Sequence, residues 1–215
     1  MEQTSVRVVT AADCGPDAVA IEFETPAEFE AAPGQFVRLT ALVEAEEISR
    51  FYTISSANVE ETFQITVGYD PVDGGPFSEY LLALDEGSQV EIAGPYGDTY
   101  HEGEPEVVIL AGGPGIGPAV GIAERVLARD GVAAVVYQDE RPIHQARLEA
   151  LAAAGVRVEL VEAPTAVAGV VNDVLDAHAE AQLFVYGFAE FLDIAGEAIE
   201  SAGGDFASAK VENFG

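Results

Sequence analysis

The stretch RFYTISS, residues 50–56, carries side chains that could do chemistry. It combines the guanidinium of Arg50, the ring of Tyr52 and the hydroxyl of Thr53 with the β-branched and aromatic residues typical of a strand. Two interpretations are open. The stretch is either the wall of a cofactor site or an ordinary sheet face with an exposed arginine and a core tyrosine.

A second candidate segment is GGPFSEYLL, residues 74–82. Gly74 and Gly75 permit close backbone approach to a ligand, and Ser78 is predicted to start a helix whose free N–H groups can receive a phosphate. Taken alone, Ser78 is also interpretable as a simple helix N-cap.

A third candidate is the glycine-rich loop in VVILAGGPGIGPAVGIAERVL, residues 107–127. A buried strand leads through the loop into a helix with Pro118 in its first turn, an arrangement that presents backbone N–H groups to a phosphate. The fingerprint G-x-G-x-x-G fails, because counting from Gly113 places Pro118 at the sixth position, and the loop has no lysine for a Walker A motif. A tight turn without a ligand remains the alternative.

Other chemistries find no support in the residue pattern. His101, His144 and His178 share no metal-ligand spacing and neighbour no plausible nucleophile, so we expect surface roles for them and no metal site. The single cysteine, Cys14, excludes an intramolecular disulfide and an all-cysteine iron–sulfur cluster.

The elements that must position these residues differ between the two halves of the chain. Up to about residue 100, apolar and polar residues alternate in short runs, as in TFQITVGY, where Gln64, Thr66 and Gly68 share the face opposite the apolar side chains. One helical insertion is expected at residues 76–84. Six such runs predict a small antiparallel barrel: SVRVV, AVAIEFE, GQFVRLTALV, RFYTIS, TFQITVGY and SQVEIAG.

Beyond Glu106 the pattern becomes strand then helix, repeated, with continuous apolar strands as in a parallel sheet covered on both faces. The final segment FASAKVENFG is a candidate edge strand. We place the boundary in residues 94–106, which divides the chain into a β-barrel domain, residues 1–100, and an α/β domain, residues 101–215. The strands expected in the second half are VVILA, AAVVY, VRVEL and LFVYG, and the helices are residues 118–130, 144–154, 167–178 and 190–201.

The charge of the chain is extreme: 38 acidic and 9 basic residues give a formal net charge of −29 at 49% apolar content. Periodic apolar blocks argue against disorder, so we interpret the acidity as adaptation to molar salt in a halophile. An acidic surface for a specific basic partner is the alternative. Nucleic acid is not an expected partner, because clustered Lys and Arg residues are missing.

No secretory signal is evident at MEQTSVRVVT, and the longest uncharged run, residues 107–123, is interrupted by glycines and prolines. We therefore expect a cytoplasmic protein without a membrane span.

In their order and spacing, several motifs resemble the ferredoxin-NADP reductase family of flavoproteins over nearly the whole chain. This resemblance implies a flavin-binding barrel followed by an NAD(P)-binding domain, in agreement with the two halves described above. The motifs are PGQFVRL (33–39), RFYTISS (50–56), GGPFSEYL (74–81), GPYG (94–97), AGGPGIGP (111–118), FVYGF (184–188) and VENFG (211–215).

For the flavin, the resemblance implies that Arg50 pairs with phosphate, that Tyr52 packs on the isoalloxazine ring and that the Thr53 hydroxyl bonds near N5, the hydride-accepting atom. Tyr52 and Thr53 are thus the candidate catalytic residues. FAD is the expected flavin, ahead of FMN. The other flavin-binding candidates are Phe51, Gly74, Gly75, Pro76, Phe77 and Ser78, with Phe214 as a cover for the ring or, equally, packed on a neighbouring helix.

For the nicotinamide nucleotide, the resemblance implies that the loop of Gly112, Gly113, Pro114, Gly115 and Ile116 receives the pyrophosphate. After the next strand, YQDER is expected near the adenosine ribose. There, Asp139 or Glu140 would favour NADH and Arg141 would favour NADPH, so the signals conflict with a slight balance toward NADH. These charges are equally interpretable as solvated surface.

Three features bear on how closely the chain follows the family pattern. Pro114 stands where the family usually has a Thr or Ser hydroxyl, and Tyr186-Gly187-Phe188 stands where it has Cys-Gly-Pro, so Tyr186 would block or reshape the nicotinamide pocket. Near the C-terminus, Glu212 is a family-like acid.

The resemblance implies an NAD(P)H-dependent flavoprotein reductase that passes electrons to an acceptor such as a ferredoxin, a flavodoxin-like protein or the redox subunit of a larger complex. Because iron–sulfur cysteines are lacking, the iron would lie in another polypeptide. The alternative is a flavin- or nucleotide-binding electron-transfer or sensor subunit with little turnover of its own, for which Pro114 and Tyr186 are the support.

Overall fold

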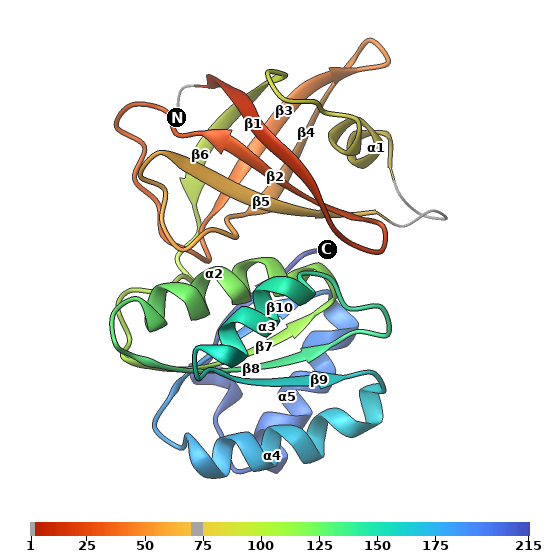
Figure 1. The fold of residues 1–215 in the computed structure, drawn as a ribbon. Coiled ribbons are helices and arrows are strands. Elements are labelled where there is room, and N and C mark those ends of the chain that lie inside the picture. Colours follow the sequence, from red (N-terminus) through yellow and green to blue (C-terminus); the bar gives the residue numbers. More distant parts are fainter. Residues whose placement is uncertain (1–2, 70–74) are drawn as a thin grey trace.

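The computed structural model describes residues 3–69 and 75–215 and forms two lobes stacked one on the other (Figure 1). The barrel lobe is an antiparallel sheet with the order β4-β3-β6-β1-β2-β5. An antiparallel bridge between Ile54 and Ile65 joins the two edges of this sheet and closes the barrel. Its strands are β1 (Thr4–Gly15), β2 (Ala18–Glu24), β3 (Phe36–Val43), β4 (Glu46–Thr53), β5 (Thr62–Gly68) and β6 (Gln89–Tyr96).

Between β5 and β6, the short helix α1 (Pro76–Leu82) covers one end of the barrel, with Phe77 and Leu81 buried. The helix begins where predicted, but it ends two residues before the predicted Leu84. Ser78 does not start it, because Pro76 already occupies the first turn and Gly75 is the N-cap.

The sheet lobe is a five-stranded parallel sheet with the order β11-β10-β7-β8-β9. The predicted edge strand near the C-terminus is β11, which pairs with β10. The fold class predicted from the sequence is therefore confirmed. The elements are β7 (Glu106–Gly112), α2 (Ile116–Leu127), β8 (Val132–Gln138), α3 (Gln145–Ala153), β9 (Arg157–Val161), α4 (Val167–Ala177), β10 (Gln182–Gly187), α5 (Ala189–Ser201) and β11 (Lys210–Asn213), with short 3-10 turns at Gly113–Gly115, Pro164–Ala166 and Phe206–Ser208.

Alternate residues of the central strands supply two separate cores. Val107 and Ile109 of β7 pack under α2 and α3, whereas Val108 and Leu110 pack over α4 and α5 (Figure 1). This two-sided burial explains why the strands are continuous apolar runs. The first of these cores also includes Ala18 of the barrel, so it extends across the junction between the lobes.

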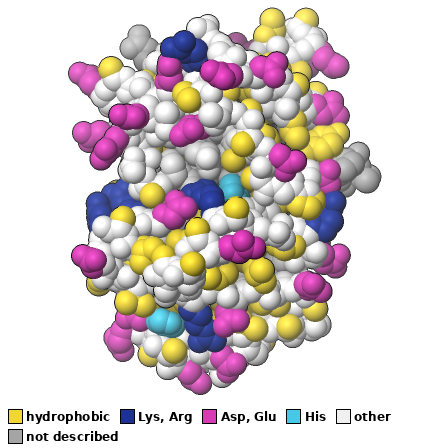
Figure 2. All heavy atoms as spheres, in the orientation of Figure 1, with side chains coloured by type: hydrophobic (Ala, Val, Ile, Leu, Met, Phe, Trp, Pro, Cys, Tyr) yellow, Lys and Arg dark blue, Asp and Glu magenta, His cyan; other side chains and the backbone are white. Residues whose placement is uncertain are grey.

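Polar side chains also tie the lobes together. Arg147 of α3 contacts Glu124 of α2 through Nε and Nη2 at 2.8 and 2.7 Å, and it donates to the Gln64 side chain and the Ser55 carbonyl of the barrel lobe at 2.9 and 2.8 Å. His144 Nε2 lies 2.8 Å from the Thr66 hydroxyl. Figure 2 shows Lys and Arg side chains along this junction, whereas Asp and Glu are scattered over the visible face of both lobes.

The expected surface roles of the histidines are wrong for two of the three. His144 is buried at the junction, where burial and then the charge of Arg147 lower its pKa to about 4. His101 is buried beside Phe184, with its Nε2 3.0 Å from the Glu104 carbonyl. Both histidines are buried through contacts with segments distant in sequence, so the residues next to them in the chain do not indicate their burial. No helix among the described residues combines the length and apolar character needed to cross a membrane.

Candidate functional site

A cavity of about 590 Å³ lies between the two lobes and collects most of the predicted site residues. The barrel lobe supplies β4, the end of β5 and the start of α1, and the sheet lobe supplies the loop after β7 and the segment that follows β11. Predicted residues that line the cavity are Arg50, Phe51, Tyr52, Thr53, Gly75, Phe77, Ser78, Pro114 and Phe214. Gly74 lies outside the described residues.

β4 and α1 are joined at the cavity wall through Tyr52. Its ring stacks on that of Phe77 with centroids 6.3 Å apart, and its hydroxyl lies near the Ser78 side chain. Burial raises the pKa of Tyr52, and the Ser78 side chain opposes that shift. Ser78 therefore lies beside the phenol, and its backbone N–H is bonded to the Gly75 carbonyl at 3.0 Å. The backbone N–H of Ser78, which was expected to meet a phosphate, is therefore already bonded within the chain.

The guanidinium of Arg50 lines the same cavity as Gly75 and Ser78. Its Nη1 donates to the Ser49 carbonyl at 2.8 Å, and no carboxylate among the described residues lies within ion-pair distance of it. An arginine at a cavity that has no ion pair among the described residues is suited to a bound anion.

Across the cavity, β11 brings Glu212 to Thr53. The Thr53 hydroxyl donates to Glu212 Oε1 at 3.1 Å, whereas Glu212 Oε2 is buried without a hydrogen-bond partner. Burial raises the pKa of Glu212 from its ordinary 4.5 to about 7, against the smaller opposing effect of the Thr53 bond. The site therefore contains a carboxyl group able to hold or release a proton near neutral pH. A buried acceptor with free capacity is what a ligand bearing a polar N–H would satisfy.

Further lining residues were not predicted for the site, notably Thr66 of β5, Pro118 of α2 and Phe188. The Phe188 ring stands edge-on to that of Phe214, with centroids 6.2 Å apart. Glu212 was identified only as a family-like acid. The single acid of the C-terminal segment VENFG was the available signal for it.

The glycines of the loop after β7 serve two purposes. A Cβ on Gly112 would lie 2.3 Å from the Phe191 ring, and one on Gly115 would lie 2.2 Å from the Tyr186 carbonyl, so both are required by packing. Gly113 differs, because its φ is +54° and a Cβ there would meet nothing within 4 Å. Ile116 is fully buried in the core. The loop is therefore open at Gly113, next to Pro114 in the cavity wall, and is not open along its whole length.

Asp139 and Arg141 lie beyond the end of β8 and do not line the cavity. Asp139 accepts from the Tyr137 hydroxyl at 3.1 Å and from the Arg141 backbone N–H at 2.8 Å. The Arg141 guanidinium forms an ion pair with Asp17 of the barrel lobe, with Nη1 2.7 Å from Oδ2.

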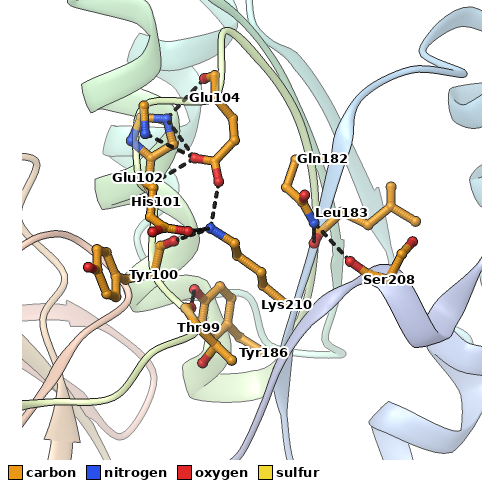
Figure 3. A network of polar contacts seen from close by, with 11 residues as sticks. Thr99, Tyr100, His101, Glu102, Glu104, Gln182, Leu183, Tyr186, Ser208 and Lys210 are labelled. Carbon is orange, nitrogen blue, oxygen red and sulfur yellow. Dashed lines mark hydrogen bonds and ion pairs between the residues drawn. The ribbon is translucent and has the colours of Figure 1, made fainter.

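The expectation that Tyr186 blocks or reshapes the pocket is wrong for this structure. Its side chain is fully buried in the core on the α2 face of the sheet, and its hydroxyl donates to the Thr99 carbonyl at 3.0 Å (Figure 3). A Cβ on the neighbouring Gly187 would meet the Phe191 ring at 2.8 Å. Both residues hold β10 in place and leave the cavity open.

A polar cluster beside Tyr186 fixes β11 to the segment that connects the lobes (Figure 3). Lys210, the only lysine, donates to the Tyr100 carbonyl at 2.7 Å, to Glu102 at 2.8 Å and to Glu104 at 2.5 Å. Burial by itself would raise the pKa of Glu104, but the hydrogen bonds from Lys210 and from backbone N–H groups lower it overall. Lys210 lies two residues before Glu212, on the same face of the strand.

Residues 5–101 match the family described as "Oxidoreductase FAD-binding domain". The chain is 32% identical to a flavohemoprotein of Burkholderia sp. (strain TH2) over 114 residues, 52% of this chain and 26% of that protein. It is 27% identical to the stachydrine N-demethylase reductase subunit of Rhizobium meliloti (strain 1021) over 230 residues, 96% of this chain and 65% of that protein. The chain thus spans about a quarter of the flavohemoprotein and just under two thirds of the reductase subunit.

Solved structures share the architecture at lower identity. The FAD/NAD-binding domain of nitric oxide dioxygenase from Vibrio cholerae has a TM-score of 0.79 at 18% identity, with 98% of both chains covered. Ferredoxin-NADP+ reductase from Plasmodium falciparum has a TM-score of 0.79 at 14% identity, with 99% of this chain and 96% of that chain covered.

The barrel, the parallel sheet and the cavity between them form the two-lobed architecture of the FAD/NAD-binding domain of nitric oxide dioxygenase and of ferredoxin-NADP+ reductase. The barrel lobe, over residues 5–101, is similar to oxidoreductase FAD-binding domains. The match confirms the prediction of an FAD-binding domain. The domain boundary at residue 100 and the salt adaptation remain predictions.

Proposed function

We propose that the chain is an NAD(P)H-dependent flavoprotein reductase that passes electrons to an acceptor protein. The observation that carries this proposal is the convergence on one cavity of Arg50, the Tyr52–Ser78 pair, the Thr53–Glu212 pair and the loop at Pro114. The residues fit FAD: a guanidinium for phosphate, aromatic walls for a planar ring, and a buried carboxyl oxygen, with neither the guanidinium nor this oxygen having a charge or hydrogen-bond partner on another element in the described part of the chain.

Bound FAD would supply a hydride acceptor that can release electrons singly. Arg50 would hold its phosphates, and Tyr52, held in place by Phe77 and Ser78, would orient its ring. The Thr53–Glu212 pair would hold a proton at the carboxyl group near neutral pH, and the aromatic walls at Phe188 and Phe214 would limit the access of water.

For the nucleotide, we propose that Gly113, beside Pro114, provides the backbone N–H contact and that NADH is preferred over NADPH. Asp139 is available to a ribose hydroxyl at the end of β8. The guanidinium of Arg141 is already committed to Asp17, so it is poorly placed to favour a 2′-phosphate.

The acceptor is proposed to be a ferredoxin or another redox protein. Relatives include reductase subunits of glycine betaine monooxygenase and of stachydrine N-demethylase. An electron-transfer subunit with little turnover of its own is the second candidate, and the missing loop hydroxyl at Pro114 favours it.

Anaerobic mixing of the FAD-loaded protein with NADH or NADPH tests the proposal. We expect rapid loss of the visible flavin absorbance, faster with NADH. Unchanged absorbance with both nucleotides in a protein that retains FAD would favour the second candidate.

Arg50→Gln tests the flavin site separately, with Arg7→Gln as the matched control, because Arg7 is an exposed barrel arginine paired with Glu24. Loss of the phosphate contact should weaken FAD binding by roughly tenfold or more in Arg50→Gln only. Equal FAD affinity in the two variants would contradict the assignment of Arg50.

A further inference from the structure

A second hollow, of about 740 Å³, lies between the lobes and shares no lining residue with the flavin cavity. The barrel lobe contributes loops after β2 and β4, including Thr25 and Asn58. The sheet lobe contributes Arg125 and Arg129 at the C-terminal end of α2. We call this hollow the α2 groove. The same helix reaches the flavin cavity with Pro118 in its first turn, so α2 connects the two hollows.

Two polar atoms of the α2 groove are buried without a hydrogen-bond partner. They are the hydroxyl Oγ1 of Thr25 and the Nε of Arg125, and they belong to a set of only five such side-chain atoms in the described part of the chain. A buried donor without a partner costs roughly 1–3 kcal/mol. Two of them at one hollow, one from each lobe, indicate a ligand that accepts hydrogen bonds.

The charges of the groove point to the same kind of ligand. Arg125 and Arg129 are one helical turn apart, and like charges at that spacing destabilise each other. Burial lowers the pKa of Arg125, and the charge of Arg129 adds to the shift. Among the described residues, no carboxylate lies within ion-pair distance of either guanidinium, whereas Arg7, Arg141, Arg147, Arg157 and Lys210 all have ion pairs.

Acidic residues limit the ligand's size and charge. Glu28, Glu30 and Glu60 also line the groove, although none forms an ion pair with the arginines. They would repel a polyanion or an acidic protein surface, but a compact group with one or two negative charges can reach the guanidiniums.

We propose that the α2 groove binds a compact oxoanion, the phosphate or carboxylate group of a small molecule, through Arg125, Arg129 and Thr25. Such a ligand contacts both lobes and therefore stabilises their arrangement. The proposal does not depend on the reductase activity.

Calorimetric titration of the FAD-saturated full-length protein with inorganic phosphate tests the site, at constant ionic strength in chloride, with acetate as the carboxylate probe. Saturation with FAD keeps phosphate out of the flavin cavity. We expect saturable binding of at least one probe, weakened about tenfold or more in Arg125→Gln and in Arg129→Gln. Thr25→Val, which keeps the shape of the side chain, should weaken it less.

Arg157→Gln is the matched control, because Arg157 is a half-exposed arginine of the sheet lobe paired with Glu159. Binding should be unchanged in this variant. The proposal is overturned if neither probe binds, if chloride competes as well as phosphate, or if Arg125→Gln and Thr25→Val bind the probe as tightly as the wild type. The preferred probe distinguishes a phosphate from a carboxylate ligand.

Discussion

At the scale of single residues, Glu212 shows how burial creates chemistry. Its carboxyl group has one partner, the Thr53 hydroxyl at 3.1 Å, and a second oxygen with none. Because burial penalises the charged form, the acid titrates near neutrality, where a surface glutamate would already be ionised. The same environment makes the residue both a candidate proton carrier and a source of instability.

The pH dependence of folding should reveal this residue. Between its unfolded pKa of 4.5 and its folded pKa of about 7, Glu212 is protonated in the folded protein and ionised in the unfolded one. The folded state therefore binds the extra proton, and stability falls as pH rises through that window. The shift corresponds to a loss on the order of 3 kcal/mol.

Glu212→Gln should abolish that loss, so the variant should gain stability relative to wild type between pH 4.5 and 7. Urea unfolding of both FAD-free proteins across this range measures the difference. Parallel pH curves for the two proteins would show that Glu212 is not perturbed.

At the scale of elements, β11 is the critical strand. It is short, lies at the sheet edge and pairs only with β10, yet it carries Glu212 into the cavity. Lys210 compensates by binding three oxygens of the segment between the lobes, so the strand is fixed from two sides (Figure 3).

Lys210→Met should therefore loosen β11 locally. We expect a loss of roughly 2 kcal/mol of stability, because Glu104 is left half-buried without its cation. Hydrogen exchange should accelerate in β11 but not in β8. Arg7→Met, which breaks an exposed ion pair, should cost about 0.5 kcal/mol or less. Unchanged exchange in β11 would show that strand pairing alone holds it.

At the scale of the whole molecule, a net charge of −29 opposes a compact fold. Several of the basic side chains lie at the junction of the lobes (Figure 2). There Arg147 and Arg141 connect elements far apart in sequence through contacts of 2.7–2.9 Å.

Salt should therefore stabilise the protein. The Debye length falls from about 10 Å at 0.1 M to about 3 Å at 1 M, which screens repulsion among dispersed carboxylates more than it weakens the half-buried contacts of Arg147. The thermal midpoint should rise as KCl increases over this range. Sucrose at matched osmolality controls for solute exclusion. A midpoint that stays flat or falls in KCl would count against the predicted salt adaptation.

Most features that depend on local sequence were predicted correctly, whereas several features that depend on contacts between distant segments were not. Alternation in residues 62–69 and the continuous apolar run of β7 predicted the barrel and the parallel sheet, because strand periodicity is local. The same reasoning failed for Ser78, because the proline ring at Pro76 shifted the helix start, and for His144, because the opposing lobe buries it.

The sequence by itself determined the element order, the fold class and the types of side chain at the cavity, since these follow from backbone periodicity and motif spacing. Only the tertiary structure decided which of them meet. Tyr186 and Ile116 are buried in the core, and Arg141 forms an ion pair with Asp17. Glu212 contacts Thr53, which lies 159 positions away in the chain. Such pairings depend on how the two lobes pack against each other. This packing depends on residues from many segments, so no single segment of the sequence predicts it.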